Sequence, residues 1–117
     1  MQRQYRLGPN RQFNYVYRRG KRVSCRELSL LYVKNGQKRV GFSVSKKVGV
    51  AVVRNRTKRR LRECIRPKLS QMQKGLYVFV ARPEAASCSF EQLDKCVAKL
   101  LQRCGAYPLQ QAEKMQL

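Results

Sequence analysis

Hydrophobic and polar positions alternate along the chain with two different periods, and the period changes several times. Near the start, Phe13, Val16 and Tyr17 recur at the three- and four-residue spacing that puts side chains on one face of a helix. Asn10 is a favourable N-cap for such a helix, and Gly20 is a favourable end. The pattern alone favours the interpretation that Phe13 and Tyr17 pack in the core.

A strand pattern follows this first helix. Residues 22–34 are rich in strand formers, and the turn dipeptide Asn35-Gly36 separates them from a second strand in the run KRVGFSVSKK. In that second strand, apolar residues alternate with small or polar ones, which predicts two unlike faces. The apolar face carries Val40, Phe42 and Val44, whereas the other carries Gly41, Ser43 and Ser45. The small, polar face fits a groove for an extended ligand and a plain solvent face equally well.

Helical spacing returns at residues 53–69. Seven positions there and just beyond form a continuous stripe that can pack on a sheet: Val53, Thr57, Leu61, Cys64, Ile65, Leu69 and Met72. Basic residues occupy most of the remaining circumference. Pro67 lacks an N–H group and clashes with the preceding turn, so we expect a kink or break near it. The pattern predicts a strongly basic, amphipathic helix.

The last third of the chain predicts one more strand and one more helix. Residues 76–82 read as a buried strand that Pro83 ends, and Ser89 with Gln92 forms a capping box for a helix that Gly105 ends. The order of helix, strands, helix, strand and helix predicts an α+β sandwich with helices against one mixed sheet. We expect a single domain over residues 1–117, with an ordered core at about 6–105 and a frayed polar C-terminal tail.

The net charge of the chain indicates what kind of partner it binds. The chain has 27 Lys and Arg against 6 Asp and Glu, a formal net charge of +21. Twelve of these basic residues lie between Lys38 and Lys68, where the only acid is Glu63. Like charges repeat four residues apart, as at Arg54, Lys58 and Arg62, and this spacing destabilises an isolated helix. A polyanion would neutralise them, and nucleic acid is the commonest one. An anionic membrane surface is the main rival.

The residue types exclude several kinds of active site. The chain has no histidine, its six acids are dispersed, and it has no glycine-rich phosphate loop, so we expect no catalytic residue in the protein itself. Its five cysteines show no paired metal-binding spacing, so we expect no metal site and interpret them as buried free thiols. The chain also shows no signal peptide and no apolar run of membrane-spanning length, which predicts a cytoplasmic protein.

The segment KRVGFSVSKKVGVAVVRNRTKRRLRE closely resembles the protein subunit of bacterial ribonuclease P. The hallmark is an R-N-R helix at Arg54-Asn55-Arg56, preceded by the strand end Ser43-Val44-Ser45-Lys46-Lys47. The early N-x-x-F-x-x-V-Y helix and the late YVFVAR strand also match, so the resemblance covers roughly residues 6–104.

The resemblance implies a function and a fold. The family is the small subunit of a ribonucleoprotein endonuclease that removes the 5′ leader from precursor tRNA, and a large RNA subunit carries the catalytic centre with Mg²⁺. The fold it implies is like the second domain of ribosomal protein S5, with a four-stranded mixed sheet, three helices and a left-handed βαβ crossover. The expected partners are the ribonuclease P RNA and precursor tRNA, with no membrane and no DNA.

The resemblance also assigns roles to residues of this chain. The residues expected to contact the catalytic RNA are Lys47, Arg54, Asn55, Arg56, Lys58, Arg59, Arg60 and Arg62. Those expected to line the leader-binding cleft are Phe13, Tyr17, Leu31, Ser43, Ser45 and Lys46. This replaces the core interpretation of Phe13 and Tyr17. The chain departs from the family where an aromatic is expected near Leu31, because the tyrosine here is Tyr32 and faces the other way in a strand. A generic basic RNA-binding or ribosomal protein without a processing role is the alternative.

Overall fold

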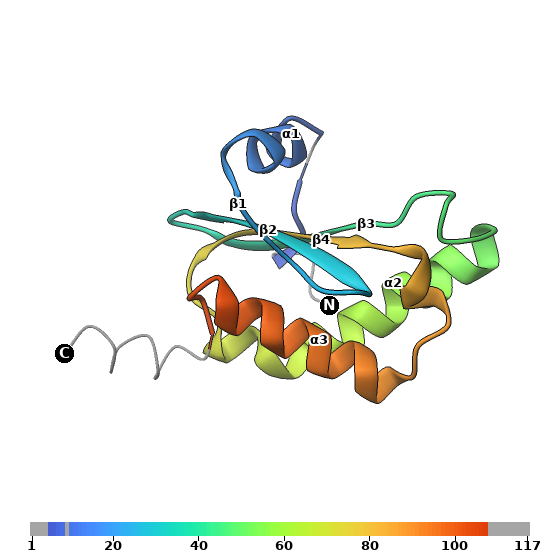
Figure 1. The fold of residues 1–117 in the computed structure, drawn as a ribbon. Coiled ribbons are helices and arrows are strands. Elements are labelled where there is room, and N and C mark those ends of the chain that lie inside the picture. Colours follow the sequence, from blue (N-terminus) through green and yellow to red (C-terminus); the bar gives the residue numbers. More distant parts are fainter. Residues whose placement is uncertain (1–4, 9, 108–117) are drawn as a thin grey trace.

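The computed structural model describes residues 5–8 and 10–107 (Figure 1). The described elements follow the chain as α1 (Asn10–Arg19), β1 (Lys21–Ser24), β2 (Leu28–Lys34), β3 (Lys38–Ser43), α2 (Ala51–Ile65), the 3-10 helix η2 (Arg66–Gln71), β4 (Gly75–Ala81), the 3-10 helix η3 (Pro83–Ala86) and α3 (Phe90–Arg103). The four strands form one mixed sheet, with α1 on one face and α2 and α3 on the other (Figure 1). The predicted α+β architecture is confirmed.

The sheet has the order β1-β2-β4-β3. β2 pairs with β1 and β4 in antiparallel register, whereas β3 pairs with β4 in parallel, so α2 belongs to the connection between two parallel neighbours. The turn at Asn35-Gly36 joins β2 to β3 as predicted, but these two strands do not pair, because β4 lies between them. The physical reason is burial. β4 is apolar and covered on both faces, which suits the interior of a sheet.

The interpretation of residues 22–34 as one strand is wrong. The chain reverses at residues 25–27, where the Cys25 N–H donates to the Leu28 carbonyl at 2.8 Å, and β1 pairs back on β2. Ser24 and Ser29 face each other across this hairpin, with their hydroxyl oxygens 2.9 Å apart. Strand propensity is high on both sides of the reversal, so composition alone did not reveal the turn.

Two apolar clusters hold the layers together. The larger one lies between the sheet and the helices α2 and α3, and includes Leu30, Phe79, Leu61 and Leu100. The smaller one lies under α1 and consists of Leu7, Val16, Leu31, Leu76 and Val78. The sheet is therefore covered on both faces, but α1 shields its face less completely than the helix pair does (Figure 1).

Helix boundaries follow the predicted signals closely. α2 begins at Ala51, two residues before the predicted start, and ends at Ile65, where the chain tightens into η2. Pro67 lies in the first turn of η2, so the predicted break near it is confirmed. The capping box of Ser89 and Gln92 is present at the start of α3, and Gly105 follows that helix with a φ of 81°. None of the described helices is long and apolar enough to cross a membrane.

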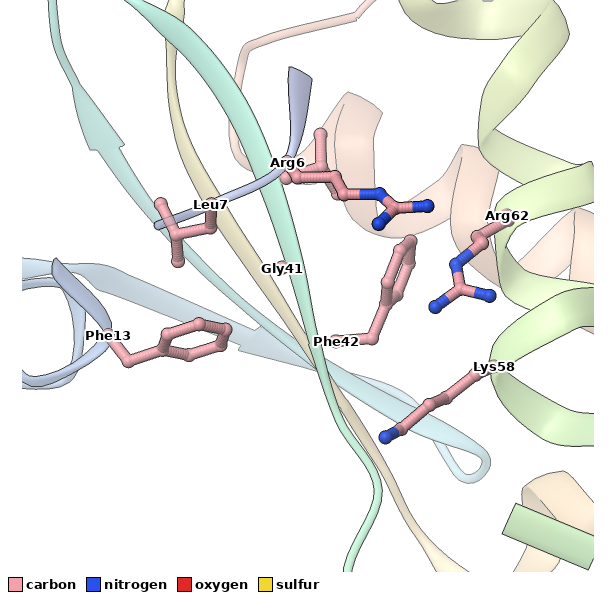
Figure 2. A pocket seen from close by; sticks show the side chains of 8 residues that line it. Arg6, Leu7, Phe13, Gly41, Phe42, Lys58 and Arg62 are labelled. Carbon is pink, nitrogen blue, oxygen red and sulfur yellow. The ribbon is translucent and has the colours of Figure 1, made fainter. Parts of the chain in front are cut away.

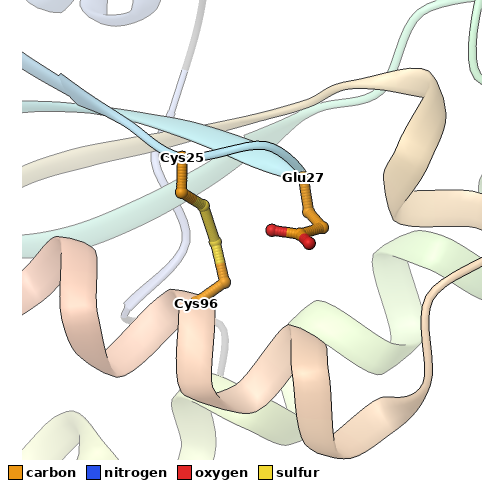
Figure 3. A group of neighbouring side chains, drawn as sticks. All are labelled: Cys25, Glu27 and Cys96. Carbon is orange, nitrogen blue, oxygen red and sulfur yellow. A yellow bond between two sulfur atoms is a disulfide. The ribbon is translucent and has the colours of Figure 1, made fainter.

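The prediction that all cysteines are free thiols is wrong for two of them. Cys25 in the β1–β2 turn and Cys96 on α3 form a disulfide across a sequence separation of 71 residues (Figure 3). The Glu27 side chain lies beside this bond, within 4.8 Å of the sulfur atoms. The two sulfurs are bonded to each other, so they are not metal ligands in this state. Spacing could not reveal the pair, because the fold brings the turn over α3. Cys64, Cys88 and Cys104 are free thiols; Cys64 and Cys104 are buried as predicted, whereas Cys88 is half-buried.

Candidate nucleic-acid interface

The edge strand β3 presents two unlike faces, as its alternation predicted. Val40 belongs to the large core on the α2 side, and Phe42 packs against that core with its ring stacked on Phe79 at a centroid distance of 6.1 Å. Gly41 faces α1. A Cβ atom placed on Gly41 would come within 2.6 Å of the Phe13 ring, so the absence of a side chain lets Phe13 lie directly on the strand. The face of β3 that carries Gly41 is therefore bordered by the aromatic ring of Phe13.

A hollow of about 370 Å³ opens where α1 crosses the end of β3. Its lining residues come from both elements and are Asn10, Phe13, Asn14, Tyr17, Phe42 and Ser43. Tyr17 is 44% exposed, and Val16 is the buried residue of α1. The pattern-based interpretation of Tyr17 as a core residue is therefore wrong, and its ring is available to a ligand. Asn10, Asn14 and Phe42 were missed by the sequence-based site.

A second, smaller hollow of about 140 Å³ lies along the outer edge of β3. It is lined by Arg6, Leu7, Phe13, Val40, Gly41, Phe42, Lys58 and Arg62. Figure 2 shows Phe13 and Leu7 on one side of β3, and Phe42 with the nitrogen atoms of Arg6, Lys58 and Arg62 on the other. The two hollows share Phe13 and Phe42 among their lining residues, so they adjoin each other along β3, and we refer to them together as the β3 groove.

The N-terminal segment completes this groove. The Leu7 N–H donates to the Val40 carbonyl at 2.9 Å, and an Arg39 guanidinium N–H donates to the Arg6 carbonyl at 3.1 Å. Arg6 and Val40 form an isolated parallel β-bridge, which holds Arg6 beside β3. Sequence reasoning missed Arg6, because a lone arginine before the first helix carries no local signal of the strand it will join.

The basic side chains of α2 divide into three groups by helical position. Arg54, Lys58 and Arg62 are spaced four residues apart on the side toward β3, where Lys58 and Arg62 line the β3 groove. The Nε atom of Arg54 is buried and has no hydrogen-bond partner among the residues that the structure describes. Of these three cations, Lys58 and Arg62 line the groove and Arg54 does not.

The remaining α2 side chains face elsewhere. Asn55 and Arg59 are exposed on the outer surface. Arg56 and Arg60 turn toward η3 and the loop after it, where their guanidinium N–H groups donate to the Ala86 carbonyl at 3.3 Å and the Cys88 carbonyl at 2.8 Å. The eight residues expected to contact the catalytic RNA therefore do not share one surface.

Leu31, which was expected in the leader cleft, and its neighbour Tyr32 lie on opposite faces of β2. Leu31 is only 4% exposed and lies in the small core beneath α1, so its side chain forms the base under α1 and is not free to touch a ligand. Tyr32 faces the opposite side of the sheet, as the period-2 geometry indicated. Its ring lies 4.8 Å from that of Tyr77, and its hydroxyl donates to the Lys74 carbonyl at 3.1 Å.

Three residues of the loop after β3 lie beyond the strand end. Ser45, Lys46 and Lys47 are all exposed, and this loop leads from Ser43 in the β3 groove to α2. The residues that line the groove include three cations and no carboxylate, whereas Glu63 on α2 is paired with Arg66 at 3.0 Å. The groove therefore combines aromatic rings with uncompensated positive charge, which suits a single-stranded polyanion.

Fold and groove together define a small, strongly basic α+β protein with a cationic, aromatic groove along the edge strand β3. Comparison with known proteins then identifies the family. The sequence model of the family described as Ribonuclease P matches residues 1–105, so the chain belongs to the ribonuclease P protein family. Members of this family are the protein component of a bacterial tRNA-processing ribonucleoprotein.

Relatives and solved structures agree with this assignment. The chain is 40% identical over 97 residues to the ribonuclease P protein component of Nitratiruptor sp., covering 83% of this chain and 89% of the relative. It is 41% identical over 108 residues to the ribonuclease P protein component of Finegoldia magna, covering 90% of this chain and 95% of the relative. The RNase P protein of Staphylococcus aureus superposes with a TM-score of 0.82 at 29% identity, covering 88% and 97% of the two chains. That of Thermotoga maritima gives 0.76 at 30% identity, covering 84% and 96%.

Proposed function

We propose that the chain binds the catalytic RNA of ribonuclease P through α2 and holds the single-stranded 5′ leader of precursor tRNA in the β3 groove. The single observation that carries this proposal is the groove itself, where Phe13 and Tyr17 border a surface flanked by Lys58 and Arg62. An arbitrary leader sequence requires sequence-tolerant contacts, and stacking on aromatic rings with backbone neutralisation by cations supplies them. The family assignment supports the tRNA-processing role.

The division of α2 supports two contacts with RNA. Lys58 and Arg62 point into the β3 groove, so they belong with the leader. Asn55 and Arg59 are exposed on the outer surface, so they are the residues of the R-N-R helix best placed to meet the catalytic RNA. An arginine fork can bind phosphate in a bidentate manner, and the Asn55 amide can hydrogen-bond a base edge or a 2′-hydroxyl.

Catalysis in this proposal belongs to the RNA subunit. The chain has no histidine, and the groove residues offer amine, guanidinium, amide, hydroxyl and aromatic groups without a carboxylate. Mg²⁺ is bound by oxygen ligands, commonly carboxylates together with phosphates and water. The residues present at the groove do not fit a protein-held Mg²⁺, so we assign the metal to the RNA subunit. The protein contributes substrate positioning and screening of phosphate repulsion.

Precursor and mature tRNA distinguish the two contacts. In a complex reconstituted with a bacterial ribonuclease P RNA, Phe13→Ala should weaken binding of precursor tRNA by about 1–3 kcal/mol and leave binding of mature tRNA unchanged. Arg59→Ala should instead weaken assembly with the catalytic RNA and flatten the log–log salt dependence by about 0.7–0.9.

Lys95→Ala on α3 is the matched control for the loss of one charge, because Lys95 is exposed and does not line the β3 groove. It should change neither measurement appreciably. Equal losses for precursor and mature tRNA in the Phe13→Ala variant would contradict the assignment of the groove to the leader. A generic RNA-binding role, without processing, predicts that result.

A further inference from the structure

A third cavity, separate from the β3 groove, lies at the end of the sheet where the β2–β3 turn meets the start of β4. Its volume is about 610 Å³, and it is lined by Tyr5, Lys34, Asn35, Lys38, Met72, Gln73 and Lys74. This cavity shares no lining residue with either hollow of the β3 groove. Its volume lies within the range of pockets that hold small organic ligands.

Three lysines converge on this cavity without an acidic residue in its lining. The Lys38 ammonium donates to the Leu69 carbonyl at 2.7 Å, which fixes its position. Burial lowers the pKa of Lys38, and the nearby charge of Lys74 lowers it further. Gathering like charges at a partly buried site costs free energy, and a bound anion would offset that cost.

The walls of the cavity are held in place by hydrogen bonds. The Tyr32 hydroxyl donates to the Lys74 carbonyl at 3.1 Å, and the Gln73 N–H donates to the Ala106 carbonyl at 2.9 Å. In the β2–β3 turn, the Asn35 side-chain oxygen accepts from the Gln37 N–H at 2.9 Å. The cavity therefore exists before any ligand arrives, which lowers the ordering cost of binding.

We propose that this cavity binds one unpaired nucleotide of RNA, with its phosphate between Lys34, Lys38 and Lys74 and its base against Tyr5. Met72 also lines the cavity but is only 1% exposed, so the contact with the base falls to the Tyr5 ring. The cavity thus offers a group for each part of a nucleotide. The lysine ammoniums bind the phosphate as point charges, and the aromatic ring stacks on any base. The source of the nucleotide rests on the function proposed above, whereas the chemistry of the cavity does not.

Binding of adenosine 5′-monophosphate to the full chain tests the chemistry directly. In ¹H–¹⁵N NMR titrations, the nucleotide should shift the amide signals of Lys34, Lys38 and Lys74 saturably. Adenosine and inorganic phosphate, titrated separately, should each bind roughly tenfold more weakly, because each lacks one of the two binding groups. Phosphate binding as tight as that of the nucleotide, or shifts scattered over the whole basic surface, would overturn the proposal.

Paired lysine variants supply the control. Lys34 and Lys74 are exposed, so Lys34→Ala with Lys74→Ala removes two charges from the cavity without disturbing the core. Lys95→Ala with Lys99→Ala removes two exposed charges from α3. The first pair should abolish saturable nucleotide binding, and the second should leave it within twofold. Similar losses in both variants would show a non-specific charge effect and contradict the cavity site.

The same two variants, reconstituted with ribonuclease P RNA, identify which RNA supplies the nucleotide. Weaker assembly assigns it to the catalytic RNA, and weaker precursor binding after normal assembly assigns it to the substrate. In either case the log–log salt dependence should flatten by about 0.7 for each phosphate that the substituted lysines had neutralised. Unchanged assembly and unchanged precursor binding would refute an RNA ligand. Failure of the leader assignment, by contrast, appears in the Phe13→Ala variant and leaves the nucleotide titration unaffected.

Discussion

Gly41→Ala is the sharpest perturbation of the β3 groove that leaves every charge in place. A Cβ atom at this position would lie 2.6 Å and 2.8 Å from two ring carbons of Phe13 and 3.0 Å from the Leu7 Cβ. Carbon atoms in contact prefer about 3.5–4.0 Å, so the Phe13 ring must withdraw by roughly 1 Å. Overpacking of this kind typically costs about 1–3 kcal/mol of stability. The ring should also leave its place on the strand, so precursor tRNA binding should weaken in the reconstituted complex.

Urea unfolding of a double-mutant cycle isolates this contact. Gly41→Ala should cost about 1–3 kcal/mol in the natural sequence and much less in the Phe13→Ala background, which removes the ring. Gly36→Ala is the control, because a Cβ atom there meets nothing within 4 Å and the φ of Gly36 is not positive. Equal costs for Gly41→Ala in both backgrounds would show that the new methyl group does not meet the Phe13 ring.

Three further predictions concern stability. Cys96→Ser, which removes the bond to Cys25 across 71 residues, should lower the free energy of unfolding by about 4 kcal/mol; an unchanged urea midpoint would contradict it. Burial raises the pKa of Cys64 from 9.0 to about 11, so its protonated thiol stabilises the fold fully below pH 9, and this contribution should be lost as pH rises through 11. The test is the difference in free energy of unfolding between the natural sequence and the Cys64→Ala variant from pH 9 to pH 11. A difference that stays constant over this range would contradict the prediction. Asp94→Asn should cost about 1–3 kcal/mol in thermal unfolding, because the buried Lys68 ammonium keeps only the Cys64 carbonyl as a partner; no change in Tm would exclude a stabilising pair.

Local signals were read correctly from the sequence because they act within a few residues. The capping box at Ser89, the break near Pro67 and the unlike faces of β3 all depend on neighbours in the chain, and the structure contains each of them. The basic character of α2 could be predicted for the same reason. The family resemblance added the importance of Phe13 and Tyr17, which hydrophobic spacing alone had placed in the core.

Features that depend on tertiary contacts could not be predicted in this way. The insertion of β4 between β2 and β3 and the bond between Cys25 and Cys96 join segments that are distant in sequence. The same holds for the hydrogen bonds from Arg56 and Arg60 on α2 to the carbonyl groups of Ala86 and Cys88. Arg6 was missed because only its position beside β3 makes it part of the groove.

Cleavage of precursor tRNA by a reconstituted complex shows whether the chain assists removal of the 5′ leader. The purified chain is mixed with a bacterial ribonuclease P RNA at a Mg²⁺ concentration where the RNA alone is slow, and removal of the 5′ leader is followed with time. We predict that the chain stimulates cleavage, that Phe13→Ala loses much of this stimulation, and that Lys95→Ala keeps it. Absence of stimulation by the natural sequence, with the RNA shown to be active at high Mg²⁺, would contradict a role of this chain in leader removal.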